Sequence, residues 1–124
     1  MLHLDTHIAI WLYYGEVQKI KRQLDTLQKN DLVVSQIVRL ELQYIYEIER
    51  IRHNPDTIIR TLQKDFGLKE TNPDNILTTN FAININWTRD VFDRLIVASA
   101  MADDAQLMTK DKTILTNFNQ AVWT

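Results

Sequence analysis

Apolar residues follow two alternating patterns along the chain. Short, almost wholly apolar runs predict strands at 1–5 (MLHLD), 31–35 (DLVVS), 68–71 (LKET), 105–109 (AQLMT) and 121–123 (AVW). Segments with apolar residues every three or four positions predict helices from Thr6 to near Gly15, at 16–29, 36–53, 54–66, 72–83 and 90–103, and from about Asp111. Ser35 and the pair Asn72 and Pro73 are typical residues for helix starts.

Strands that are apolar at nearly every position are typical of a parallel sheet, which is buried on both faces. Parallel strands also need crossover connections, and the intervening helices supply them. We therefore predict one domain over 1–124, a three-layer α/β/α sandwich with a short, mostly parallel sheet. Ligands of such sheets bind beyond the carboxyl ends of the strands, where Asp5 and Asp111 are expected.

Composition narrows the class of protein. With 124 residues, 45% of them hydrophobic and 24% charged, the chain suits one soluble globular domain. No apolar run approaches the roughly 20 residues that cross a bilayer, and no basic segment precedes the first apolar residues, so we expect a cytoplasmic protein without a membrane anchor. The chain has no cysteine, which excludes disulfides and thiolate zinc sites.

The formal net charge of −2 does not indicate a generally basic, nucleic-acid-binding surface. Basic residues do flank the acidic segments, and these are Arg89, Arg94, Lys110 and Lys112. A second basic group on the early helix, formed by Lys19, Lys21, Arg22 and Lys29, is explained at least as well by a solvated helix face.

Glu41 lies within the apolar stripe of the helix predicted at 36–53. The stripe consists of Ile37, Leu40, Tyr44, Ile45, Ile48 and Ile51. An ionised carboxylate on such a face costs several kcal/mol unless it is paired or binds a metal. Two explanations for Glu41 are therefore possible. Its carboxylate forms a salt bridge to Arg94 or Arg89, or it belongs to a metal site.

Four further acids are each explicable as helix caps. Asp5 ends a strand expected near the middle of the sheet, Asp90 and Asp93 begin a helix that is apolar on all sides, and Asp111 follows a strand. Together with Glu41 they fall on one rim of the predicted sheet. Clustered carboxylates repel one another, and a bound Mg²⁺ or Mn²⁺ ion commonly neutralises them. Such an ion also suits the hydrolysis of phosphodiesters. The three histidines show no metal-ligand spacing.

Four segments, LDTH, VSQIVRLEL, RDVFDRLIVASA and LMTKD, occur in an order that resembles the PIN-domain ribonucleases, in particular the VapC-like toxins of prokaryotic toxin–antitoxin modules. The resemblance covers essentially the whole chain. It implies a Mg²⁺- or Mn²⁺-dependent endoribonuclease whose metal-binding acids match Asp5, Glu41, Asp93 and Asp111. Asp90 matches an additional acid. Thr109 matches a hydroxyl residue two positions before the last acid, and Thr6 matches a polar residue directly after the first. Val91 stands where the family usually has proline.

The same resemblance implies a homodimer and a cognate antitoxin that occludes the active site. Aromatic residues on two helices exceed what a small core hides, and they are expected to contribute to such a surface: Trp11, Tyr13, Tyr14, Tyr44 and Tyr46. We expect Asp5 and Asp93 to be the principal metal ligands, and Glu41 and Asp111 to bind a second ion or orient water. Asp90 is expected to act through water or as a cap.

Guidance of the RNA substrate is expected from Arg94, Lys110 and Lys112. Two alternatives remain at this level: a catalytically silent module that binds RNA or protein, and another Mg²⁺-dependent phosphohydrolase such as a phosphatase. The segment DTHIA after the first strand lacks the second aspartate of a DxD nucleophile pair, which disfavours the phosphatase.

Overall fold

The computed structural model describes residues 1–124, and it contains one sheet of five parallel strands in the order β3-β2-β1-β4-β5. The strands are β1 (Leu2–Leu4), β2 (Leu32–Ser35), β3 (Lys69–Thr71), β4 (Gln106–Met108) and β5 (Ala121–Val122). Every residue of β1 and β2 is buried, which explains why their sequences are continuous apolar runs rather than alternating ones. The prediction of a parallel α/β sheet is confirmed.

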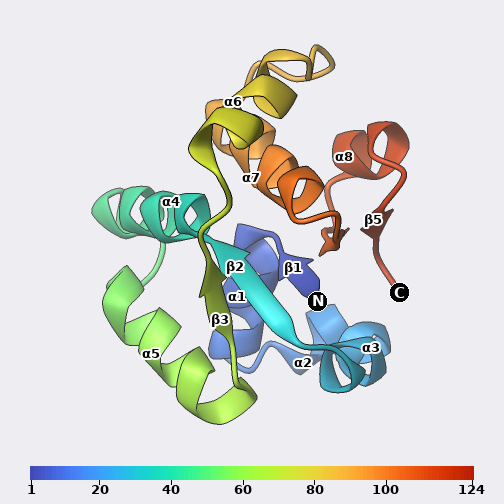
Figure 1. The fold of residues 1–124 in the computed structure, drawn as a ribbon. Coiled ribbons are helices and arrows are strands. Elements are labelled where there is room, and N and C mark those ends of the chain that lie inside the picture. Colours follow the sequence, from blue (N-terminus) through green and yellow to red (C-terminus); the bar gives the residue numbers. More distant parts are fainter.

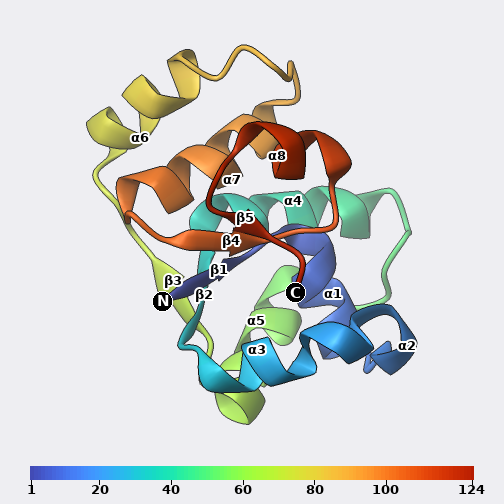
Figure 2. The same cartoon turned by 90° about the vertical axis from the view of Figure 1, so that its right-hand side faces the viewer.

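Helices cover both faces of this sheet. They are α1 (Thr6–Tyr13), α2 (Val17–Ile20), the 3-10 helix η1 (Lys21–Gln23), α3 (Leu24–Lys29), α4 (Gln36–Glu47), α5 (Pro55–Phe66), α6 (Asn75–Ile83), α7 (Val91–Ala102) and α8 (Lys112–Asn117). α1, α2, α3 and α5 lie on one face, and α6, α7 and α8 on the other (Figures 1 and 2). α4 packs against α1, α5 and α7 and so joins the two helical layers. No helix is long and apolar enough to span a membrane.

Two helices and one helix cap in this part of the chain differ from the sequence prediction. The segment 16–29 is broken into α2, η1 and α3. The start predicted at Asn72 is wrong, because Asp74 forms the cap by accepting a hydrogen bond from the Leu77 N–H at 2.9 Å. Ser35 does hold the N-cap position of α4, but its side chain makes no capping hydrogen bond.

The helix predicted at 36–53 ends at Glu47. Glu49 has a φ of 62°, a left-handed conformation that stops the helix and turns the chain back toward α1. The returning segment is fixed there, because the Tyr13 hydroxyl and His53 Nδ1 are hydrogen-bonded at 2.9 Å and the Arg52 N–H donates to the Tyr14 hydroxyl at 3.1 Å. These tertiary contacts therefore end the helix at Glu47, although the apolar periodicity of the sequence continues to residue 53.

The core-facing stripe of α4 was also predicted wrongly. Its buried residues are Val38, Leu42 and Ile45, whereas Leu40, Tyr44 and Ile48 are 57%, 51% and 44% exposed. Apolar residues lie on two faces of α4, and the sequence does not show which face meets the sheet and α7. Glu41 nevertheless belongs to the buried face, one helical turn from Val38 and Ile45. Tyr44 is exposed but lies toward α7, with its ring centroid 6.0 Å from that of Phe92.

The far end of α7 is held by a polar cluster within the fold. His3 is buried in β1, and its Nε2 lies 2.8 Å from Asp103 Oδ2, which also accepts a hydrogen bond from the Thr71 hydroxyl at 2.6 Å. Burial lowers the pKa of His3, so this ring is neutral over most of the physiological range. The cluster connects α7 to β1 and β3.

Candidate functional site

The strand order creates the crevice in which the acids gather. From β1 the chain builds outward through β2 and β3, then returns to place β4 on the other side of β1. The carboxyl ends of β1 and β4 form the switch point, where ligands of parallel sheets bind. Asp5 follows β1 directly, and Asp111 lies three residues beyond β4. The Asp5 N–H donates to the Met108 carbonyl at 3.0 Å, which joins these two strand ends.

Asp5 lies at the bottom of the crevice with 7% of its surface exposed. One carboxylate oxygen accepts a hydrogen bond from the Thr6 N–H at 2.8 Å, and the other accepts one from the Thr109 hydroxyl at 2.6 Å. Burial raises the pKa of Asp5, the two hydrogen bonds lower it, and the nearby charge of Asp111 raises it further. The side chain is thus fixed in position and costly to ionise without a counter-charge.

Thr109 connects two of the predicted metal ligands. It is fully buried, its hydroxyl donates to Asp5, and the same hydroxyl oxygen accepts the Asp111 N–H at 3.0 Å. A threonine hydroxyl has one hydrogen to donate, and here it is directed at the carboxylate. Thr109 therefore fixes the spacing between Asp5 and the backbone of Asp111.

Glu41 enters the crevice from α4. Its Oε1 accepts a hydrogen bond from the hydroxyl of the fully buried Thr6. No lysine or arginine forms a salt bridge with it, so the alternative of a pair with Arg94 or Arg89 is wrong. Burial raises the pKa of Glu41, and the charges of Asp5 and Asp90 raise it further. The carboxylate therefore has no salt bridge to offset its burial.

Asp93 completes the cluster from the first turn of α7. Its pKa is raised to about 7, chiefly by burial and then by the charges of Asp90, Asp5, Asp111 and Glu41. Each of the other four acids contributes to this shift, so all five lie within one electrostatic neighbourhood. A carboxyl that titrates near neutral pH beside other acids is a frequent mark of a functional site.

The capping roles of Asp90 and Asp111 are confirmed, and they leave room for a second role. Asp90 Oδ1 accepts the Asp93 N–H at 2.9 Å, and Asp111 Oδ1 accepts the Ile114 N–H at 3.0 Å. Each cap uses one oxygen of the carboxylate. Both residues are exposed and flank the more buried acids.

The donor chemistry fits a hard divalent cation, although no three acidic or histidine side chains surround one point closely enough to coordinate a single ion directly. Five carboxylates and two hydroxyls face the crevice, and no lysine or arginine forms a salt bridge with any of them. Magnesium keeps several of its waters in protein sites and commonly takes only one or two carboxylates directly. A spaced acidic crevice of this kind therefore suits an ion held partly through water.

The three basic residues expected to guide the substrate lie around this crevice, and they differ in their contacts within the chain. Arg94 Nε donates to the Thr88 carbonyl at 2.8 Å and so holds the loop before α7. Lys112 is the exposed first residue of α8. Lys110 is exposed, and its Nζ lies 5.7 Å from the ring centroid of Trp11.

Sequence reasoning missed His7, which lies near the acids on the first turn of α1. Its charge lowers the pKa of both Asp5 and Glu41. The available signal was its position two residues after Asp5, on the helix that begins at the crevice. His7 and Glu41 also line one end of a groove of about 640 Å³ that extends to Ile48 and Arg52.

Residues 2–118 match the PIN domain family. The chain belongs to the PIN domain family. A search of curated proteins finds no match. Among solved structures, this PIN domain is similar to a chain of the VapBC2 complex from Rickettsia felis, which is bound to a DNA fragment from the promoter of its genes. The TM-score is 0.71 and the sequence identity 19%, and the match covers 98% of this chain and 96% of that chain. It is also similar to a chain of DNA-bound VapBC from Salmonella typhimurium, with a TM-score of 0.63 and 15% identity over 97% and 93%. These likenesses establish the fold.

Proposed function

We propose that this PIN domain is a VapC-like toxin, an endoribonuclease that hydrolyses RNA phosphodiesters with Mg²⁺ or Mn²⁺. The observation that supports this most directly is the convergence of five acids without a lysine or arginine partner, in a crevice where burial first, and then the charges of the other four acids, raise the pKa of Asp93 to about 7. A divalent ion would relieve that repulsion and, when bound, supplies positive charge and an activated water for attack at phosphorus.

The chain's own residues set the geometry for this reaction. Asp5 and Asp93 would hold the ion, and Glu41 and Asp111 would hold a second ion or orient the attacking water. Thr109 fixes Asp5 against Asp111, and Thr6 fixes Glu41 through its hydroxyl and Asp5 through its N–H. Asp90 starts α7 so that Asp93 faces the crevice.

We further propose that the activity is held in check by a cognate antitoxin and that the toxin forms a homodimer in the cytoplasm. The structural neighbours are VapBC complexes, which supports a protein partner. The exposed apolar residues of α4, Leu40, Tyr44 and Ile48, offer a surface that a partner can cover.

Cleavage of a single-stranded or looped RNA in EDTA and in Mn²⁺ tests the proposed activity. We expect no cleavage in the chelator and restored cleavage with the metal. The Asp5→Asn protein, purified in parallel, controls for contaminating nuclease and should stay inactive in Mn²⁺. Equal cleavage in excess EDTA, or full activity of Asp5→Asn, would refute the metal mechanism.

A further inference from the structure

A group of aromatic and basic side chains gathers beside the acidic crevice, and we name it the Trp11–Trp123 cluster. It consists of His7, Trp11, Lys19, Lys110 and Trp123. The two indole rings meet edge to face with centroids 6.3 Å apart. Lys19 Nζ lies 5.4 Å from the Trp11 centroid, and Lys110 Nζ lies 5.7 Å from Trp11 and 6.0 Å from Trp123.

The position of Trp123 is fixed from two sides. The side chain of Gln23, only 3% exposed, donates to the Trp123 carbonyl at 2.6 Å. The preceding residue, Val122, pairs with Met108 in the sheet and accepts the Thr109 N–H at 3.0 Å. A buried amide and a strand pairing therefore fix the backbone at Trp123, whose ring contacts Trp11 of α1. Figure 2 shows the C-terminal end of the chain close to α1.

The cluster is continuous with the acidic crevice. Lys110 stands between Thr109, which holds Asp5, and Asp111. His7 is one helical turn before Trp11, its ring centroid is 6.1 Å from that indole, and its charge acts on Asp5 and Glu41. A ligand that bridges the crevice and the cluster would meet carboxylates at one end and aromatic rings with ammonium groups at the other.

The exposure and charge of the cluster favour a ligand over a purely structural role. Trp11 and Trp123 pack against the core but each keeps part of its surface exposed. Lys19 and Lys110 are exposed, and neither forms a salt bridge within the chain. Both ammonium groups therefore remain available to an external anion.

We propose that the Trp11–Trp123 cluster is a base-stacking subsite that holds a nucleobase of single-stranded RNA while Lys19 and Lys110 contact its neighbouring phosphates. This inference rests on the proposed function for its choice of RNA as the ligand. The acidic crevice by itself repels a polyanion, so binding strength must come from another surface. Aromatic platforms flanked by basic residues supply it for single strands, with little dependence on the base.

Binding in EDTA separates this subsite from catalysis. The probe is a fluorescein-labelled single-stranded RNA of about ten nucleotides, read by fluorescence anisotropy and checked on a gel for integrity. Trp123→Leu should weaken binding by about 5- to 100-fold, the range expected for one stacked base. Trp123→Tyr keeps an aromatic ring and should restore most of the loss. Lys110→Gln should weaken binding and reduce its salt dependence.

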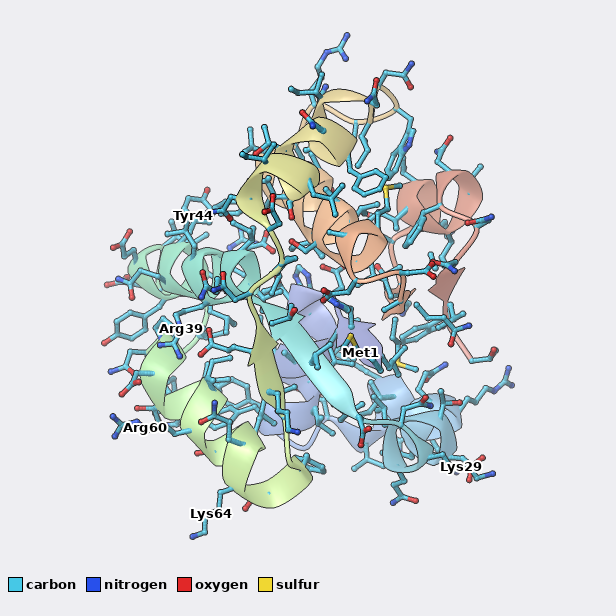
Figure 3. All side chains as sticks on the ribbon, in the orientation of Figure 1. Met1, Lys29, Arg39, Tyr44, Arg60 and Lys64 are labelled. Carbon is cyan, nitrogen blue, oxygen red and sulfur yellow. The ribbon has the colours of Figure 1, made fainter.

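The matched charge control is Lys64→Gln on α5, far from β5 and α8 (Figure 3), and its affinity should equal that of the wild type. A second probe carries the same backbone with abasic sites in place of bases. The wild-type protein should bind this probe as weakly as Trp123→Leu binds intact RNA. The comparison of intact and abasic RNA on the wild type uses unaltered protein, so it stands even where a variant folds poorly, which melting curves will show.

Unchanged RNA affinity of folded Trp123→Leu, or equal binding of intact and abasic probes by the wild type, overturns the subsite. So does a loss of binding to a protein partner with no loss of RNA binding, because it would assign the cluster to that partner. Failure of the proposed function gives a different result. The wild type would then bind the probe through Trp123 in EDTA but leave it uncut in Mn²⁺.

Discussion

The hydroxyl of Thr109 donates a hydrogen bond to Asp5 Oδ2 at 2.6 Å across 104 positions of sequence. The same oxygen accepts the Asp111 N–H at 3.0 Å, so one buried side chain sets the distance between two acids from different strands. Neither acid could be held so firmly by its helix cap alone, because a cap constrains a carboxylate only with respect to its own helix.

Thr109→Val tests this link. The substitution leaves Asp5 Oδ2 and the Asp111 N–H without their buried partner, so we expect a loss of about 1 to 3 kcal/mol in the free energy of unfolding. The pKa of Asp5 should rise, because the lost hydrogen bond lowers it. Urea unfolding measures the loss of stability. Titration calorimetry with Mn²⁺ measures metal affinity, which should fall because the carboxylate of Asp5 is harder to ionise. Thr109→Ser keeps the hydroxyl and should behave like the wild type; equal damage in both variants would contradict the role given to the hydrogen bond.

Glu41→Gln separates function from stability. The amide can still accept the Thr6 hydrogen bond, while the unpaired negative charge disappears. We expect the metal-free protein to be as stable as the wild type or more stable, and RNA cleavage to be abolished or severely reduced. Glu47→Gln, on the exposed last residue of the same helix, is the matched control and should cleave normally. Thermal melts in EDTA and cleavage assays in Mn²⁺ provide the two readouts. Near-normal cleavage together with a loss of about 3 kcal/mol or more in stability would assign Glu41 a structural role.

The raised pKa of Asp93 predicts a specific dependence of stability on pH. Between its ordinary value of 3.8 and about 7, the folded metal-free chain keeps a proton that the unfolded chain has lost. Stability must therefore fall as the pH rises through this window. Asp93→Asn removes this titration, so from about pH 4 to about pH 7 the wild type should lose stability relative to the variant.

Comparison of the two proteins isolates Asp93 from His3. The lowered pKa of His3 gives a slope of opposite sign, but His3 is present in both proteins. Urea unfolding in EDTA at a series of pH values measures the difference. Addition of Mn²⁺ should remove the disadvantage of the wild type at high pH, because the ion binds the ionised carboxylate. Parallel curves for the two proteins in EDTA would contradict the raised pKa.

The exposed stripe of α4 predicts association. Ile48 is 44% exposed and lines the groove beside the acids, so Ile48→Asp places a charge on this apolar surface. We expect little change in melting temperature, because the side chain is outside the buried core, but a marked loss of binding to a partner. Sedimentation measures self-association, and a pull-down with a candidate antitoxin, a small DNA-binding protein if a neighbouring reading frame encodes one, measures antitoxin binding. Lys64→Asp, on α5, is a surface control. Wild-type behaviour of Ile48→Asp in both assays would show that this stripe is not a binding surface.

Most of the fold could be predicted from the sequence, because β1 and β2 are buried on both faces and their apolar runs show it directly. The path of α4 could not. Its two apolar faces look equivalent in the sequence, and only the packing against the sheet and α7 distinguishes Val38 from Leu40. Its end at Glu47 depends on a left-handed Glu49 and on contacts made by Tyr13 and Tyr14 from another helix.

Four acids of the site were predictable because each follows a strand or begins a helix at the edge where parallel strands end, and Glu41 was predictable because a carboxylate among apolar helix positions needs a partner. The structure brings Asp5, Glu41, Asp90, Asp93 and Asp111 into one neighbourhood, as expected. Their metal-binding roles remain predictions. The Trp11–Trp123 cluster could not be predicted, because its members come from separate segments without a common periodicity, and Gln23 gives no sign in the sequence that it anchors Trp123.

The switch-point arrangement also has a consequence for protein synthesis. A ribosome releases the five acids in sequence order, and the crevice needs both Asp5 and the strand β4 that precedes Asp111. An unfinished chain that lacks β4 has no partner for the carboxyl end of β1 on that side. Whatever chemistry the crevice performs can therefore begin only after nearly nine-tenths of these 124 residues have been translated. A half-made copy of the protein therefore cannot carry out that chemistry.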